Sequence, residues 1–598
     1  MAKISAATEE KVYSIQKWLG LNQAGDGDTN LKMGEASEMV NFRVTNDGAL
    51  KKRPGMKALH DFGGEINGAW HGYVGGAEYT VVSAGGKLYT VDVAEHAVSE
   101  IGTVADAHTE FFGFSEKLYI LDGTQYQVWA GGESSAAPVA GYVPVLFVRT
   151  PPEGGGTELQ AVNKLTPKRR VWFSPDGTAT DFVLPEKAIA AVTSVKNRAT
   201  GDTITEFTAD TASGKVTFTS GPPPAGTNTI EITYVSAGDG AEVKKMRFAE
   251  IYNGATDNRV FLYGDGSNRA LYSGLDYDGN PTAEYFPDLN VLDIGDENTP
   301  ITQLIRHYSR LIAFKTDSAY SVQYGQITLS DGRETAAFYW SPINRAIGNC
   351  APGQVRLVDN NPLTLFNNSV YRWVNSGGYS SNLTVDERQA KRVSDRVWKT
   401  LRGMDLERAY CFDDNERKEW YCVCGETAAV YNYGLNVWYV YENFPVRYMV
   451  EFDGRLFGAR GSKLVEIADE FRNDCGSAIS ARWASGNMAF GADYRRKYSA
   501  MLWVGISPVA GGELGVTIET DRKADFSKKI VSKNMATFTK ANFGNWSFAT
   551  SRRPEMERLK LKAKKFTYYK LIFTNDSANT TAAVTSADVR VRYTGYVR

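Results

Sequence analysis

The sequence predicts an all-β fold: a β-propeller of about six or seven blades with an inserted β-sandwich and a C-terminal β-sandwich. The composition, with 57 Gly, 32 Tyr, 28 Phe and 12 Trp, suits many short strands joined by tight turns. A hairpin pattern recurs along the chain, and amphipathic helical stretches are scarce. Because a single hydrophobic core stops growing at roughly 250–300 residues, a chain of 598 residues is expected to form several domains.

Residues 1–60 are expected to form an extended N-terminal arm with turns. Asn46-Asp-Gly48 and Pro54-Gly55 are turn sequences, because Gly accepts a positive φ and Pro fixes its own φ. Between these two turns there is room only for a short extended link.

Residues 61–150 and 246–475 are expected to form the propeller in two parts. Each repeat is an apolar strand, a polar turn, and an apolar-aromatic pair that opens the return strand. The clearest turns are Gly85-Gly86, Ser115-Glu116, Thr316-Asp317, Asn367-Asn368 and Asp453-Gly454. Candidates near 258–262 and 409–440 bring the number of hairpins to about seven. Antiparallel repeats that cannot bury a face alone stack on one another, and a ring of them is a propeller. The irregular spacing leaves an ordinary sandwich as the alternative.

Two further segments interrupt or follow the repeat. Residues 151–245 alternate with period two, as in Gly214-Lys-Val-Thr-Phe-Thr219, and lie beside Gly- and Pro-rich stretches. They are expected to form an inserted β-sandwich domain. Residues 476–598 contain long alternating strands and are expected to form a separate C-terminal β-sandwich.

One helix is predicted between these elements. Thr384 and Glu387 form a capping-box pair, and Val393, Val397 and Leu401 then recur at helical spacing. Ala390 and Trp398 would lie on the same side. We expect this helix to brace the ring.

The N-terminal motifs resemble those of a known family. Leu19-Gly-Leu-Asn22, the segment from Gly34 to Phe42, and Asp47-Gly-Ala-Leu-Lys-Lys-Arg-Pro-Gly55 follow one another closely. They resemble the opening of the tail-nozzle proteins of short-tailed bacteriophages, also described as tail tubular or packaged-DNA stabilisation proteins. Further similar blocks include Asp257–Leu262 and Ile347–Pro352, so that the resemblance covers about two thirds of the chain.

The resemblance implies a structural virion protein. Proteins of that family form a homohexameric ring, each subunit largely a β-propeller, below the head-tail adaptor ring. The implied partners are other copies of the chain, the adaptor ring, tail-fibre or tail-tip proteins, and genomic DNA in transient, non-specific contact. The ring continues the ejection channel and helps retain the packaged genome. The implied location is the phage tail, after assembly in the bacterial host cytoplasm.

The residues contain no recognisable catalytic, cofactor or metal motif, so we expect no enzyme and no cofactor. The five His are scattered, and no His-Glu-x-x-His, Cys-x-x-Cys or phosphate-binding loop occurs. Asp26-Gly-Asp-Thr-Asn30 begins like a calcium loop, but Leu31 and Ser37 occupy positions that such loops give to Gly and Glu. Cys422 and Cys424 face one way on a strand, which favours a buried face over a metal site. The five Cys are expected to be reduced.

Charge and hydropathy limit the other partners. The formal net charge of −2 provides no whole-molecule field for nucleic acid or an anionic membrane. No window approaches the roughly 18 apolar residues of a membrane span, so no membrane insertion is expected and the protein is expected to be made in soluble form.

A local basic cluster is the candidate DNA contact. Residues 552–598 hold eleven Lys or Arg and four Asp or Glu, an excess of seven positive charges. Lys560, Lys562 and Lys564 alternate with apolar residues and would share one face of a strand. They could contact DNA phosphates in the channel. Alternatively, they only keep an edge strand from pairing with neighbouring molecules, which is the interpretation that we favour slightly.

Two other function classes stay open. One is a carbohydrate-binding β-propeller at the phage tail tip that uses exposed Trp and Tyr for host recognition. Aromatic residues clustered on one open face would favour it, whereas aromatic residues buried between blades would favour a structural role. The other is a glycosidase, which would require paired carboxylates at the propeller centre.

Overall fold

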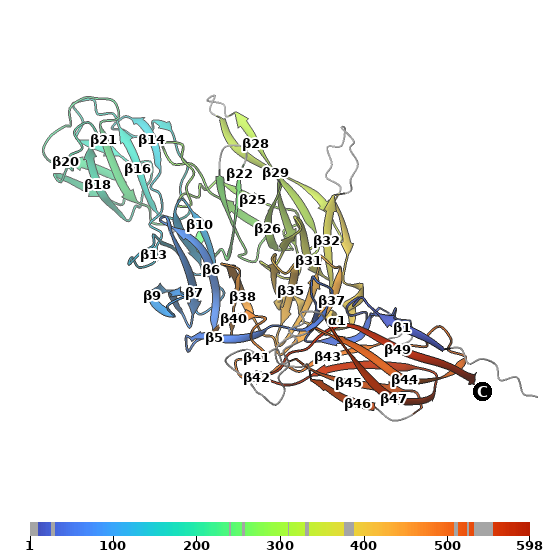
Figure 1. The fold of residues 1–598 in the computed structure, drawn as a ribbon. Helices are drawn as coiled ribbons and strands as arrows, with labels where there is room; N and C mark the ends of the chain where they lie inside the picture. The colour runs from blue at the N-terminus through green and yellow to red at the C-terminus, as the bar shows by residue number, and fades with distance from the viewer. Residues whose placement is uncertain are drawn as a thin grey trace, which may run out of the picture. The chain divides into compact units, whose positions relative to one another are not determined.

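The computed structural model describes residues 10–24, 30–238, 241–253, 258–308, 310–328, 334–375, 388–507, 512–522, 526–531 and 554–597 (Figure 1). Within these residues the chain forms 49 strands, one short α-helix and three 3-10 turns, so the predicted all-β class is confirmed. The chain divides into two compact units. Unit 1 contains the described parts of 10–66, 354–375 and 388–597, and unit 2 contains those of 67–353.

Unit 2 contains four antiparallel sheets of four strands each, in chain order. The first two are β6 (Ile66–Val74), β7 (Ala77–Ala84), β8 (Lys87–Asp92) and β9 (Ala97–Thr103), then β10 (Glu110–Phe114), β11 (Lys117–Leu121), β12 (Tyr126–Trp129) and β13 (Ala137–Pro138). The next two are β22 (Phe248–Asn253), β23 (Asn258–Tyr263), β24 (Arg269–Tyr272) and β25 (Val291–Asp293), then β26 (Ile301–His307), β27 (Arg310–Lys315), β28 (Ala319–Thr328) and β29 (Glu334–Asn344).

These four sheets stack in the manner of propeller blades. One apolar cluster, which includes Leu88 and Trp129, joins the first sheet to the second. A second cluster, with Tyr126 and Val260, joins the second to the third, and a third cluster, with Phe261 and Leu304, joins the third to the fourth. The first strands of the last three sheets, β10, β22 and β26, are neighbours in that order. Each of the first three sheets of unit 2 therefore buries a face against the next sheet of that unit.

The predicted hairpin turns are confirmed, and their dihedral angles explain some of their sequences. Ser115 and Glu116 have φ of 47° and 60°, and Asn367 and Asn368 have φ of 47° and 54°. Two-residue turns with positive φ at both positions match the right-handed twist of the strands they join. Asn and Gly tolerate this conformation best, which explains the sequences Gly85-Gly86 and Asn367-Asn368 but not Ser115-Glu116.

The inserted domain of unit 2 is a two-sheet β-sandwich, as predicted. One sheet contains β14 (Val145–Thr150), β15 (Thr157–Glu158), β16 (Lys168–Phe173), β18 (Ala191–Asn197) and β21 (Ile230–Val235), and the other contains β17 (Asp181–Val183), β19 (Phe207–Asp210) and β20 (Lys215–Phe218). Apolar residues of both sheets form one core, with Phe173 and Phe182 in edge-to-face contact at 5.3 Å. A 3-10 turn, η1 (Val243–Lys245), follows the domain. The first strand of the inserted domain, β14, begins at Val145, which is before the expected domain boundary at 151.

Unit 1 continues the repeat with three more groups of four antiparallel strands, two of which belong to larger sheets. The fifth and sixth are β30 (Arg356–Val358), β31 (Asn361–Phe366), β32 (Ser369–Asn375) and β33 (Arg388–Arg392), then β34 (Tyr410–Asp414), β35 (Glu419–Cys424), β36 (Thr427–Asn432) and β37 (Val437–Glu442). The seventh is β38 (Arg447–Phe452), β39 (Arg455–Arg460), β40 (Lys463–Ala468) and β5 (Gly55–Asp61), extended by β41 (Asn473–Asp474) and β42 (Ser477–Ala478). The first strands β30, β34 and β38 are again neighbours. The described residues thus contain seven blade-like sheets, within the range predicted.

The predicted helix is wrong in its extent. Ala390 lies in the strand β33, and helical structure is confined to the 3-10 turn η2 (Asp395–Val397) and α1 (Trp398–Arg402); a further 3-10 turn, η3 (Leu406–Arg408), follows. Thr384 and Glu387 lie outside the described residues. Strand β33 completes the fifth sheet by pairing with β32. The hydrogen bonds between β32 and β33 stabilise a strand at this position more than the helical spacing of apolar residues would stabilise a helix.

The N-terminal arm is built into the sheets of unit 1. Its strands are β1 (Glu10–Ile15), β2 (Ala36–Val40), β3 (Phe42–Val44), β4 (Leu50–Lys52) and β5. Strand β2 pairs with β37 of the sixth blade-like sheet on one side and with β43 (Ala481–Ser485) on the other. Strand β5 pairs with β40 and completes the seventh. The arm therefore connects blade-like sheets with the C-terminal domain.

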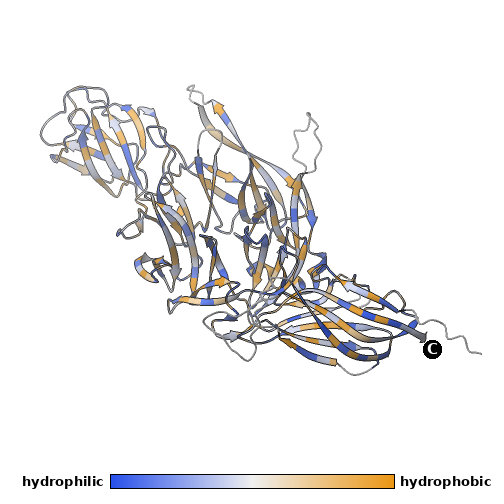
Figure 2. Cartoon of the chain, viewed as in Figure 1, coloured by the Kyte–Doolittle hydropathy of each residue, from blue (hydrophilic) through white to orange (hydrophobic). Residues whose placement is uncertain are grey.

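The C-terminal domain is a sandwich, but it shares a sheet with the sixth blade-like sheet and is not separate from it. The shared nine-stranded sheet runs from β34 to β37 through β2 to β43, β48 (Tyr569–Asn575), β45 (Glu513–Thr520) and β46 (Phe526–Val531). The second sheet contains β1, β3, β4, β44 (Arg495–Ile506), β47 (Glu555–Phe566) and β49 (Ala583–Tyr596). Figure 2 shows hydrophobic and hydrophilic residues alternating along these long strands. Trp18 links the two sheets, because its Nε1 donates to the Val584 carbonyl at 3.1 Å and its ring packs edge-on against Trp483.

Candidate functional site

The three lysines predicted as a DNA contact lie together on β47. Lys560, Lys562 and Lys564 are exposed, whereas Leu559 and Leu561, which alternate with them, are buried. Among the described strands β47 pairs only with β44, so it is an edge of its sheet there. Both interpretations drawn from the sequence, a DNA contact and protection of an edge strand, require this placement.

The pairing of strands extends this surface beyond the three lysines. On β44, Tyr498 lies opposite Lys564, and Met501 lies opposite Lys560. On its other side β44 pairs with β49, where Arg592 and Arg590 face the same two positions. We call the six cations of β47 and β49 on the outer side of this sheet the basic face: Arg558, Lys560, Lys562, Lys564, Arg590 and Arg592.

The sequence did not show that β49 contributes to the basic face. Residues 590 and 592 also alternate with apolar residues, but 26 or more positions separate them from the lysines of β47. The only cue was that both segments fall within the basic stretch 552–598. Only the order of the strands in the sheet, with β49 and β47 on either side of β44, shows that Arg590 and Arg592 share a surface with the lysines.

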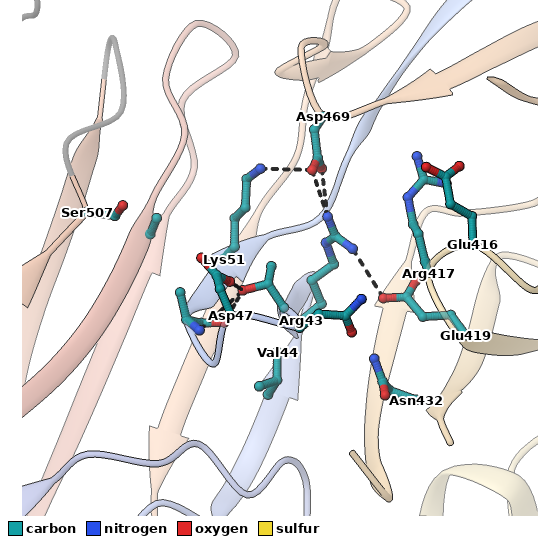
Figure 3. A pocket seen from close by; sticks show the side chains of 14 residues that line it. Arg43, Val44, Asp47, Lys51, Glu416, Arg417, Glu419, Asn432, Asp469 and Ser507 are labelled. Carbon is teal, nitrogen blue, oxygen red and sulfur yellow. Dashed lines mark hydrogen bonds and ion pairs between the residues drawn. The ribbon is translucent and has the colours of Figure 1, made fainter. Parts of the chain in front are cut away.

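A polar pocket of about 530 Å³ lies elsewhere in unit 1 (Figure 3). It is lined by the β3–β4 hairpin of the arm, by the β34–β35 turn and β36, by Asp469 after β40, and by the sandwich residues Ser507 and Ala583. Its charged residues include Arg43, Lys51, Arg417, Glu419 and Asp469. The pocket therefore lies where the N-terminal arm, blade-like sheets and C-terminal sandwich meet.

Arg43 is the central charge of the pocket. Its Nη1 donates to Glu419 Oε1 at 3.2 Å, and its Nη2 donates to both oxygens of Asp469 at 2.9 and 2.8 Å. Although burial opposes it, the attraction of Glu419 raises the pKa of Arg43 well above its ordinary value. Burial likewise works against ionisation of Asp469, but Arg43 and Lys51 lower the pKa of that carboxyl.

Glu419 is completely buried and is satisfied from three directions. Besides Arg43, Tyr421 donates its hydroxyl to Oε2 at 2.7 Å, and Tyr439 donates to Oε1 at 2.6 Å. Burial and the nearby Glu419 carboxylate raise the pKa of both tyrosines well above the ordinary value. Such a fully hydrogen-bonded carboxylate fixes the positions of its neighbours.

The Lys-Lys-Arg motif at 51–53 extends this junction, a role that sequence analysis did not predict. Lys51 Nζ is 2.8 Å from Asp469. Lys52 Nζ donates to Asn575 Oδ1 at 2.8 Å and to the Ser577 carbonyl at 2.9 Å. The next residue, Arg53, forms a two-pronged ion pair with Asp474. Because the partners lie more than 400 positions away in the sequence, only the fold could identify them.

The other candidates that the sequence suggested do not assemble a reactive centre in the part of the chain that the structure describes. No group of three or more His, Cys, Asp or Glu side chains there is arranged to hold a metal ion. Cys422 is buried and Cys424 is half-buried. The calcium-like segment 26–29 lies outside the described residues. Among the described side chains, Ser507 in the pocket has no hydrogen bond to a general base.

One pair of carboxylates in unit 2 bears on the glycosidase alternative. Glu250 on β22 and Glu110 on β10 interact electrostatically from neighbouring strands. Burial raises the pKa of Glu250 to about 7, although a hydrogen bond from the Arg306 backbone opposes the shift. Glu110 in turn lies 3.4 Å from His108 Nε2.

Comparison with known proteins gives no family. No family model and no curated protein matches the chain. Among solved structures, a chain of the mitotic checkpoint complex is 10% identical, with 71% of this chain and 95% of that chain covered and a TM-score of 0.30. Kluyveromyces lactis Hsv2 is 8% identical, covering 63% and 97%, with a TM-score of 0.22. An exo-β-1,3-galactanase from Phanerochaete chrysosporium is 9% identical, covering 90% and 100%, with a TM-score of 0.16. Similarities this distant assign no function.

No helix in the described residues is both long enough and apolar enough to span a membrane.

Proposed function

We propose that this chain is a non-catalytic subunit of a phage tail nozzle. It would form a homohexameric ring below the head-tail adaptor ring, continue the DNA ejection channel, and help retain the packaged genome. Tail-fibre or tail-tip proteins would be further partners, and the basic face would touch genomic DNA transiently and without reading sequence. The protein would reach the virion after assembly in the host cytoplasm.

The observation that carries this proposal is what the motif at 47–55 does in the fold. That motif is one of the three N-terminal blocks that resemble the opening of nozzle proteins. Its cations, Lys51, Lys52 and Arg53, all bind structural partners in the seventh blade-like sheet or the C-terminal sandwich. A motif whose charges hold domains together supports a structural role.

The position of the aromatic residues supports the same choice over a carbohydrate-binding propeller. Trp129, Trp373, Trp420, Trp438 and Trp483 are among the largest fully buried side chains. Tyr339 and Trp340 on β29 are 56% and 40% exposed. As consecutive strand residues, these two point to opposite faces of the sheet and do not form one platform. A sugar-binding surface would need several rings on one face.

The experiment that tests the proposal is an image of the virion at subunit resolution. A nozzle subunit forms a head-to-tail interface, and such an interface closes into a ring at a fixed copy number. We expect six copies around the tail axis, directly below the adaptor. One or three copies, or a position at the tips of fibres, would contradict the proposal and favour the host-recognition alternative.

A further inference from the structure

The basic face surrounds a line of large side chains. Strand β44 lies between β47 and β49, and its outward residues Tyr498, Met501 and Trp503 are half-buried. Trp503 lies opposite Arg558 on β47 and opposite Asp588 on β49. Tyr498 and Met501 therefore have a cation on each side, whereas Trp503 has a cation on one side and a carboxylate on the other.

The charges of this surface are largely unpaired. Arg590 donates to Glu10 on β1 at 2.6 Å, so that cation is neutralised. Arg592 lies opposite the same Glu10 and is attracted by its carboxylate. Arg558, Lys560, Lys562 and Lys564 have no ion-pair partner among the described residues, and Asp588 is the only other acid on the outer side of the described parts of β44, β47 and β49. The connecting sequence 532–553 contains four Lys or Arg and no Asp or Glu, so it supplies no counter-charge.

We propose that this face binds single-stranded nucleic acid, with phosphates along the cations and bases against Tyr498 and Trp503. Single-strand binding proteins combine a positively charged path for the backbone with aromatic rings on which the bases stack. The inference goes beyond the proposed nozzle function, which requires only loose contact with duplex DNA, and it does not depend on it.

The geometry favours a single strand over a duplex. Neighbouring strands lie about 4.8 Å apart, which places the two rows of cations about 10 Å from each other with the rings between them. Alternate residues along β47 are about 6.8 Å apart, so Lys560, Lys562 and Lys564 form an evenly spaced row. In a duplex the bases are stacked inside and cannot reach the rings. An unpaired strand can place phosphates beside the cations and bases over the rings of Tyr498 and Trp503 at the same time.

The test is fluorescence anisotropy of the purified full chain with a labelled 20-nucleotide poly(dT) and with a labelled 20-base-pair duplex. We expect tighter binding of poly(dT), without dependence on sequence. Lys560→Gln, Lys562→Gln and Lys564→Gln together should remove about three phosphate contacts, which lowers the double-logarithmic salt slope by about 2. Between about 50 and 200 mM salt, the native chain should therefore lose about twentyfold more affinity than the variant.

Two further variants separate stacking from charge. Tyr498→Ala should weaken poly(dT) binding about tenfold and leave duplex binding unchanged, because only unpaired bases stack on the ring. The matched control replaces three exposed lysines of other strands, Lys57, Lys463 and Lys528, with Gln. It removes the same charge and should leave the salt slope unchanged.

Each other outcome overturns the inference. Equal affinity for duplex and poly(dT), unaffected by Tyr498→Ala, would show a general polyanion surface. Preference for an acidic polysaccharide such as heparin over poly(dT) would assign a different ligand. If the lysine variant aggregates but binds poly(dT) with the native salt slope, the lysines only protect the edge strand. Circular dichroism of each variant establishes that the fold is retained.

Discussion

Arg53 and Asp474 form a two-pronged ion pair inside unit 1. Arg53 Nη1 donates to Oδ1 at 3.0 Å and Nη2 donates to Oδ2 at 2.6 Å, with the two side chains 0% and 4% exposed. The guanidinium also lies over the rings of Tyr441 and Phe444, at 5.7 and 5.2 Å from their centroids. Parallel hydrogen bonds between planar groups give both strength and a defined orientation. The pair therefore fixes where the N-terminal arm enters the seventh blade-like sheet.

Removing one partner of this pair should be costly. Arg53→Met leaves the Asp474 carboxylate buried without its cation, and we expect the free energy of unfolding to fall by about 3–5 kcal/mol. Replacing both residues, Arg53→Met with Asp474→Leu, should recover much of that loss, because no unpaired charge is left buried. Urea unfolding followed by tryptophan fluorescence checks this, since Trp420, Trp438 and Trp483 are buried in unit 1. Lys528→Gln, at an exposed site, is the control and should change stability by less than about 0.5 kcal/mol. Equal loss in the single and double variants would contradict the argument.

Local signals in the sequence predicted the hairpins but not the junction. Asn367-Asn368 specifies a tight turn through its own dihedral preferences, so a short window was sufficient. The Arg53–Asp474 pair joins residues 421 positions apart, and no local pattern encodes such a contact. The same limit explains the misplaced helix, because the pairing of β33 with β32 decided the conformation of Ala390. Lys560, Lys562 and Lys564 could be assigned to one face from alternation alone, whereas Arg590 and Arg592 required knowledge of which strands are neighbours.

Lys52 should make stability rise at alkaline pH. Burial, followed by the adjacent Arg53, lowers the pKa of Lys52 from 10.5 to about 8. Between these two values the unfolded chain holds a proton that the native chain has released, so the free energy of unfolding rises with pH. A shift of this size corresponds to about 3 kcal/mol.

The measurement compares the native chain with Lys52→Met by urea unfolding between pH 7.5 and 10.5. Met has no titrating group, so the difference in unfolding free energy, native minus variant, should increase by about 3 kcal/mol across this range. Other lysines and tyrosines titrate in both proteins and cancel in the difference. Parallel pH profiles would show that Lys52 keeps its ordinary pKa.

Asp413 should make the free energy of unfolding fall as the pH rises from acidic to neutral values, which is opposite to the effect of Lys52. Burial raises the pKa of Asp413 to about 7, and the nearby carboxylate of Asp414 adds to the shift, although a hydrogen bond with Tyr433 opposes it. Between about pH 4 and 7 the native chain binds a proton that the unfolded chain has lost, so stability falls as pH rises.

Asp413→Asn removes this titration. We expect the variant to match the native chain near pH 4 and to exceed its free energy of unfolding by about 2 kcal/mol at pH 8, after allowance for partial exposure of the group. Asp414→Asn is the matched control on the next residue. Asp414 accepts from Arg417 Nη1 at 2.8 Å, so its replacement should destabilise the protein at pH 8. Stabilisation by both changes would point to general charge relief instead of the specific environment of Asp413.

The carboxylate pair of unit 2 provides the test of catalysis. A retaining glycosidase uses one carboxyl of raised pKa as the acid and a second carboxylate about 5 Å away as the nucleophile. Glu250 has the raised pKa, but its carboxylate accepts a hydrogen bond from the Arg306 backbone. Glu110 lies 3.4 Å from His108 Nε2. Because the sequence offers no motif for an acid and a nucleophile, we expect no release of reducing sugar from cell-wall or β-linked oligosaccharides. If turnover is measured, Glu250→Gln and Glu110→Gln should be compared with Glu284→Gln, whose carboxylate pairs with Lys117 on the second sheet. Turnover that disappears in the first two variants and survives in the third would replace the nozzle proposal with a glycosidase.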